Sequence, residues 1–167
     1  MRGELLRLKE YAAGHGLCGR YREMWDAAAD GRMLADMALD ANGALFIGEA
    51  FASGWLTEEL VCGQFGRFVN GGYVRRGDGY TSALWCGEKD IRLVLEETQT
   101  CVACCTGVVR VPAGRVRRLL VTGGSHLKVR CEGRLDLVLF GDVRADVEKV
   151  GDGRCRMRRH EGRFFAY

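Results

Sequence analysis

The spacing of hydrophobic residues along the chain changes near residue 70. Before that point apolar residues recur at intervals of three and four, which is the spacing of α-helices that bury one side. After Asn70 the chain turns to short alternating stretches rich in Gly, Val, Tyr and Arg, which are typical of strands joined by tight turns. The pattern predicts a helical domain over 1–72, a connector over 73–90 and a β-repeat domain over 91–167.

Glycine and asparagine divide the helical half into shorter pieces. The predicted helices cover residues 4–13, 19–29, 31–39, 44–52 and 58–69. Thr57 is expected to cap the last helix, because its hydroxyl can accept a hydrogen bond from a free backbone N–H in the first turn. Three helices should each bury one apolar stripe, formed by Leu5, Leu8 and Ala12, by Tyr21, Met24 and Trp25, and by Leu60, Val61, Phe65 and Phe68.

The β half repeats with a period of eighteen residues. Glycines keep this interval, Gly123 with Gly141 and Gly133 with Gly151, as tight corners without a Cβ require. Stacked eighteen-residue units would place like side chains in ladders, so the period predicts a β-solenoid and an α+β fold overall. The apolar series are Leu93, Val111, Val129 and Val147, then Leu119, Leu137 and Cys155, then Val121, Leu139 and Met157.

An antiparallel β-meander is the alternative fold for the second half. Its strands also follow one another at about eight to ten residues with glycine turns between them. A meander gives no reason for side chains to match at eighteen, so we favour the solenoid. Lys149 and Arg159 fall at positions that an alternating strand turns inward, which predicts an open or re-registered last turn, with Phe164, Phe165 and Tyr167 closing its end.

The composition indicates a soluble protein and argues against a membrane-spanning or secreted one. The 167 residues are 47% hydrophobic and 28% charged, which is typical of a folded soluble protein, and no apolar run approaches the ~20 residues that span a membrane. The start, MRGELLRLKE, lacks the pattern of a secretory signal. We therefore expect a cytoplasmic protein without a membrane partner.

Eight cysteines raise the question of a metal site. Cys101, Cys104 and Cys105 form a C-x-x-C-C motif, which with Cys86 or Cys131 has the thiolates of a zinc site. A second paired motif at zinc spacing is missing, and cysteine packs readily inside strands. We therefore favour buried, reduced thiols and expect no cofactor, with zinc as the alternative.

The sequence offers no recognisable catalytic constellation. His15, His126 and His160 lie far apart, and no Ser or Cys has a nucleophile motif such as G-x-S-x-G. The carboxylates of the β half fall at turns and at outward strand positions, where solvation explains them. We expect a protein that is not an enzyme.

Arginines gather near the C-terminus. On a strand, alternate arginines point to one face and can bind phosphates of a nucleic acid. The alternative is a charged edge that discourages further strand addition, which we favour because Glu148, Asp152 and Glu161 are interspersed and the net charge is only +3. The cluster comprises Arg154, Arg156, Arg158, Arg159 and Arg163.

Part of the chain resembles a group of uncharacterised small proteins of gut anaerobes and their phages or mobile elements. The residues that carry the resemblance lie within 30–90 and include Met37 to Gly43, Gly54-Trp55, Phe65, Phe68, Asn70-Gly71, Tyr73, Gly79 to Ser82 and Trp85-Cys86.

The β half is similar in style to bactofilin and adhesin-head β-helix repeats, and the resemblance to bactofilins implies a scaffolding role. Together with the repeat, it leads us to expect a non-enzymatic binding or assembly protein that binds a protein partner or itself. A nucleic-acid-binding protein is the first alternative, and an enzyme is the second.

Overall fold

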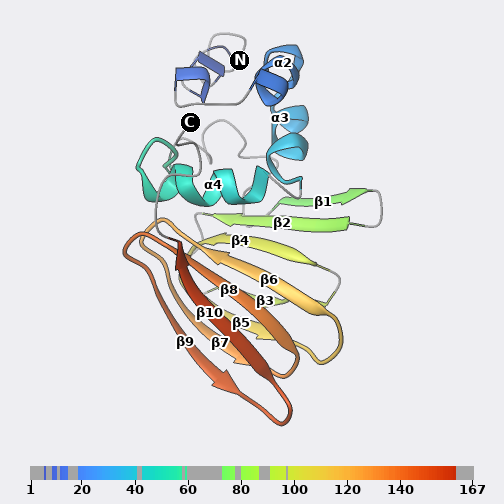
Figure 1. The fold of residues 1–167 in the computed structure, drawn as a ribbon, viewed down its shortest axis with the longest axis vertical. Helices are drawn as coiled ribbons and strands as arrows, with labels where there is room; N and C mark the ends of the chain where they lie inside the picture. Colours follow the sequence, from blue (N-terminus) through green and yellow to red (C-terminus); the bar gives the residue numbers. More distant parts are fainter. Residues whose placement is uncertain are drawn as a thin grey trace.

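The structure is a computed structural model, and it shows helices at one end and a stack of strands below them (Figure 1). The residues that it describes are 6, 9–10, 12–14, 19–40, 43–57, 59, 73–77, 80–86, 91–96 and 98–160.

Three helices lie where the apolar spacing predicts them: α2 (Gly19–Ala27), α3 (Gly31–Ala38) and α4 (Gly43–Ala52). Asp30 caps α3, because its carboxylate accepts a hydrogen bond from the backbone N–H of Met33. In the predicted stripe of α2, Trp25 is buried but Met24 is 46% exposed, so that part of the prediction is wrong. The predicted helices over 4–13 and 58–69 lie largely outside the described residues.

The strands confirm the β-solenoid. Sheet A has the order β1-β2-β4-β6-β8-β10, and sheet B has the order β3-β5-β7-β9. Every strand pair is parallel except β1 with β2, which form a hairpin in the predicted connector. The strands are β1 (Tyr73–Gly77), β2 (Tyr80–Cys86), β3 (Ile91–Val94), β4 (Thr100–Cys104), β5 (Gly107–Val111), β6 (Val116–Val121), β7 (His126–Cys131), β8 (Arg134–Phe140), β9 (Arg144–Lys149) and β10 (Arg154–His160).

The repeat of about eighteen residues holds in sheet A from β2 to β8, where Leu119 pairs with Leu137. In sheet B, β7 and β9 keep the same interval, since Val129 pairs with Val147 as predicted. The pairs β3 with β5, β5 with β7, and β8 with β10 depart from it by two residues. Leu93 pairs with Val109 instead of the predicted Val111, and Met157 pairs with Leu137 instead of Leu139. All these offsets are even, so every side chain keeps its face of the sheet although the corners differ in length.

Two hydrophobic cores share sheet A. Inward side chains such as Leu119 and Val121 fill the space between the two sheets. Leu120, between them in sequence, points outward and belongs to a second core formed with α4. The Thr122 hydroxyl donates a 2.7 Å hydrogen bond to the carbonyl oxygen of Gly48 and so ties the end of β6 to α4. Helices and solenoid therefore pack as one body.

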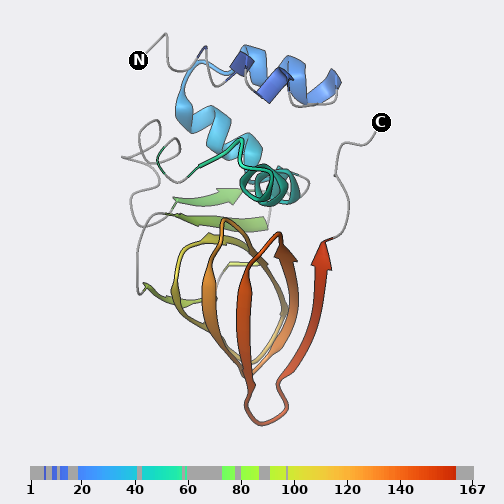
Figure 2. The same ribbon diagram turned by 90° about the vertical axis from the view of Figure 1, so that its left-hand side faces the viewer.

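The two ends of the solenoid differ. At the first end β1 pairs antiparallel with β2, and the helices pack nearby (Figure 1). At the other end β9 and β10 are the edge strands of the two sheets, and among the described strands none lies beyond them. Figure 2 shows the strand that leads to the C-terminus at one margin of the solenoid.

Candidate interaction surface at the open end of the solenoid

The predicted arginine cluster is divided between the two faces of strand β10. Arg154, Arg156 and Arg158 alternate along β10 and are exposed on the outer face of sheet A. Arg159 is in register with the inward Leu139, and its guanidinium donates hydrogen bonds to the carbonyl oxygens of Gly141 and Val143. Arg163 lies outside the described residues. Three of the five predicted arginines therefore share one surface.

Neighbouring strands add two arginines that the sequence reasoning missed. Arg134 of β8 is in register with Arg154, and Arg118 of β6 is in the same row as Asp136 and Arg156. The eighteen-residue spacing from Arg118 to Asp136 is the signal that points to this row. We call this surface the arginine face, and it consists of Arg118, Arg134, Asp136, Arg154, Arg156 and Arg158.

The arginine face holds five guanidinium groups and one carboxylate. Asp136 lies between two of them, with Oδ2 3.2 Å from Arg118 Nε and Oδ1 3.8 Å from Arg158 Nε. Two of the three acidic residues that were expected to lie among the arginines are found elsewhere, and the third, Glu161, lies outside the described residues. Glu148 points outward from β9 in sheet B, and Asp152 lies in the turn before β10. The surface is therefore more strongly basic than the order of residues along the chain suggests.

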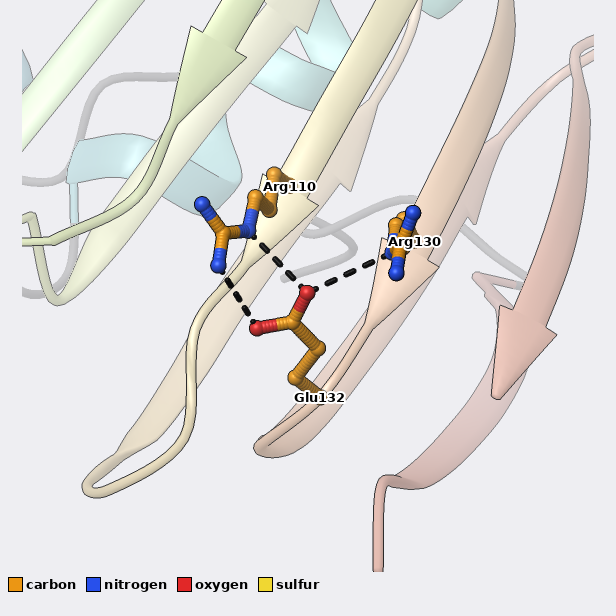
Figure 3. Close-up of polar contacts among 3 residues, drawn as sticks. All are labelled: Arg110, Arg130 and Glu132. Atoms are coloured by element: carbon orange, nitrogen blue, oxygen red, sulfur yellow. Dashed lines mark hydrogen bonds and ion pairs between the residues drawn. The ribbon is translucent and has the colours of Figure 1, made fainter. Parts of the chain in front are cut away.

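The outer face of sheet B is charge-balanced by comparison. Glu132 accepts hydrogen bonds from Arg110 Nε at 3.1 Å and Nη2 at 2.9 Å, and it lies 3.3 Å from Arg130 Nε (Figure 3). The Arg110 guanidinium holds the pKa of the Glu132 carboxyl below its usual value. At the edge, β9 presents Asp146 and Glu148 together with Arg144, so its outward row contains both signs of charge, whereas the outward charged residues of β10 are arginines.

The interior of the solenoid is incompletely covered at the β9 and β10 end. Met157 is 55% exposed, although its register partner Leu137 is fully buried. Lys149 is in register with the inward Cys131, as the alternation predicts, and its side chain is exposed. The predicted closure by Phe164, Phe165 and Tyr167 lies outside the described residues. An apolar patch thus adjoins the two charged edge strands.

The sequence pattern also did not predict an arginine that is buried inside the solenoid. Arg117 at the start of β6 is only 7% exposed and is in register with the inward Leu135. Its Nε donates a 2.9 Å hydrogen bond to the Leu95 carbonyl oxygen, and its Nη2 donates to the carbonyl oxygen of Glu96. Arg117 therefore holds the chain segment after β3 against β6 and has a structural role.

The C-x-x-C-C motif is divided between the two cores. Cys101 and Cys105 lie in the core between the sheets, whereas Cys104 points toward α4 and is in register with Cys86. Burial, with a contribution from Cys105, raises the pKa of the Cys101 thiol far above its usual value. Strand alternation separates Cys104 from Cys101 and Cys105, and within the described ranges no three His, Cys, Asp or Glu side chains converge on a metal position.

The histidines are also separated. His126 Nε2 lies 2.8 Å from Asp146 on the face of sheet B, whereas His160 packs on the Phe140 ring at 4.7 Å and lies 3.4 Å from Glu49 Oε2. His15 lies outside the described residues.

A surface hollow of about 580 Å³ is found at the opposite end of the molecule, beside α2. Its charged lining is Lys9, Glu10, Arg22 and Asp26. Lys9 is already engaged, because its ammonium donates hydrogen bonds to the carbonyl oxygens of Asp26 and Ala28. This hollow does not include any of the predicted site residues.

No family model, curated protein or solved structure matched the chain. Of the resemblances drawn from the sequence, the β-solenoid is the part that the structure shows. Among the described helices none has the length and apolar character needed to cross a membrane.

Proposed function

We propose that the protein is a non-enzymatic binding or assembly protein that docks a protein partner at the open end of its solenoid. The observation that carries the proposal is the difference between the two ends. At the first end the edge strand of sheet A is β1, which runs antiparallel to its neighbour β2, whereas at the other end the edge strands β9 and β10 have the exposed Met157 and charged side chains beside them. An edge strand offers unpaired backbone N–H and C=O groups to a further strand.

The side chains at this end suit recognition better than catalysis. Met157 supplies exposed apolar area next to the row of Arg154, Arg156 and Arg158. Apolar contacts stabilise an interface, whereas charged residues around them select the partner and its orientation. The interaction therefore combines strand pairing with charge selection.

Hydrogen–deuterium exchange tests this assignment. In any complex of the chain, with itself or with a protein captured from a lysate, backbone amides of β9 and β10 should become protected. Amides of β3, which is the edge strand of sheet B at the other end, should not change. A complex that protects only the helices or β3, or a chain that forms no complex, would contradict the proposal.

A nucleic acid bound across the arginine face is the second candidate. The position of Arg118 and Arg134 beside the β10 arginines favours it, because together they form a basic surface three strands wide. Arginines that neutralise phosphates give an affinity that falls steeply with salt.

Salt titrations with duplex and single-stranded DNA test this candidate. Each of Arg134→Ser and Arg154→Ser should reduce the slope of log affinity against log salt by about 0.7 to 0.9. Arg92→Ser on sheet B is the matched control, since Arg92 lies on the outer face of the opposite sheet. Equal slopes for all three variants would exclude a phosphate contact at the arginine face.

A further inference from the structure

The geometry points to a second copy of the chain as the partner at the open end. We propose a closed dimer in which β10 of one copy pairs antiparallel with β9 of the other copy, and the same contact forms twice about a two-fold axis. This inference rests on the proposed function, because it names the occupant of the same surface.

The topology allows this arrangement. β9 and β10 belong to different sheets and run in opposite directions, because the chain reverses between the two sheets (Figure 1). A two-fold axis parallel to the strands places the edge of sheet A in one copy beside the edge of sheet B in the other copy. Both sheets then continue across the interface, and neither β9 nor β10 remains an edge.

Charge selects this axis over the other two-fold arrangement. An axis perpendicular to the sheets would pair β10 with its own copy and set Arg154, Arg156 and Arg158 against the same arginines. Like charges directly opposite each other on neighbouring strands are destabilising, whereas opposite charges are stabilising. Pairing β10 with β9 instead brings the arginines beside Asp146 and Glu148.

One register pairs two arginines of β10 with the two carboxylates of β9 and leaves Lys149 opposite Cys155. With Arg156 opposite Glu148, antiparallel pairing places Arg158 opposite Asp146 on the outer face. The same register places Met157 opposite Val147 on the inner face, where the exposed Met157 becomes covered. The interior of one solenoid then continues into that of the other.

An open filament is disfavoured by the residues of β1. Head-to-tail stacking in sheet A would place β10 next to β1 of the following copy. β1 has the sequence YVRRG and carries Arg75 and Arg76 without an acidic residue. Arginines would again face arginines, so association should stop at the dimer.

Charge reversal in purified full-length chain tests the pairing. Light scattering at low ionic strength should give twice the 18.5 kDa of one chain. Arg156→Glu/Arg158→Glu and Asp146→Arg/Glu148→Arg should each weaken dimerisation by about tenfold or more, since the contact occurs twice. The chain that carries all four substitutions should dimerise again, because acid and base exchange places.

Arg92→Glu on β3 is the control, which should leave the dimer intact, and the thermal melting of each variant checks that it folds. A four-substitution chain that stays monomeric while wild type dimerises would show a different interface and overturn the pairing.

Other outcomes separate this inference from the proposed function. A wild-type chain that is monomeric at a protein concentration of about 100 μM, yet binds another protein through β9 and β10, would overturn the dimer and keep the proposed function. A monomer without any protein partner would overturn both. Arginine variants that bind DNA more weakly but have the same molar mass as wild type in light scattering would also overturn the dimer and favour the nucleic-acid candidate.

Discussion

Sheet A and sheet B are built from the same repeat but differ in what covers them. The strands of sheet A that contact α4 contain continuous apolar runs, such as CVAC in β4 and LVLF at the end of β8. The strands of sheet B alternate, as in HLKVRC of β7, where every second residue is exposed. A continuous run therefore marks a strand that is buried on both faces, and alternation marks one whose outer face meets water.

Sheet A is itself divided along its strands. Its outer face is apolar where α4 crosses it, at Leu120 and Val138, and basic where the helix does not reach, at Arg118 and Arg134. The change takes place within a single strand. The position of α4 therefore determines which outward residues are core and which form the arginine face.

The largest expected effect is a loss of stability, and it should differ between outward positions on the two sheets. Leu120→Ala should lower the free energy of unfolding by about 2–5 kcal/mol, because it opens a cavity between sheet A and α4. Val108→Ala on sheet B, where the side chain is 43% exposed, should cost less than about 1 kcal/mol. Urea unfolding of both variants measures the difference. Equal costs would show that α4 does not cover sheet A in solution.

A smaller effect contrasts two glycines of one corner. Gly123 and Gly124 both have positive φ, at 67° and 74°. A Cβ at Gly123 would overlap the Sγ of Cys104, whereas a Cβ at Gly124 meets no atom within 4 Å. Both alanine variants carry backbone strain, but Gly123→Ala should cost about 1–3 kcal/mol more because it also overpacks the core below α4. Thermal or urea unfolding that gives the same stability for both would contradict this packing.

The smallest effect concerns the charge balance on sheet B. The pKa of Glu132 is lower in the folded chain than in the unfolded chain, so its stabilising contribution is present above about pH 4.3 and is lost as pH falls through the folded value. Glu132→Gln should therefore reduce stability at pH 7 and have less effect at pH 3. Arg110→Gln should reduce the same pH dependence, because it removes the nearer of the two guanidinium partners and leaves Arg130. An unchanged pH profile in both variants would show that the pair is not formed in solution.

Much of the fold followed from local pattern. Apolar spacing identified α2, α3 and α4, and the eighteen-residue period identified the parallel solenoid. The register was less predictable, because corners can lengthen or shorten by two residues without moving a side chain to the other face. Leu93 therefore pairs with Val109 although Val111 matches the period.

The candidate site was only partly predictable. Alternation along β10 correctly placed Arg154, Arg156 and Arg158 on one face. Arg159 was counted with them, but its inward register turns it toward Gly141. Arg134 was missed because it lies twenty residues before its neighbour Arg154, outside the strict period.

By itself, the sequence determined which side chains lie on opposite faces of each strand, since alternation is a local property of extended backbone. That property also separates Cys104 from Cys101 and Cys105. Only the tertiary structure decided which outward residues are buried, because that depends on where α4 crosses sheet A. It also decided that Arg118 joins the β10 arginines while Glu148 does not, because sheet membership depends on the long-range pairing of strands.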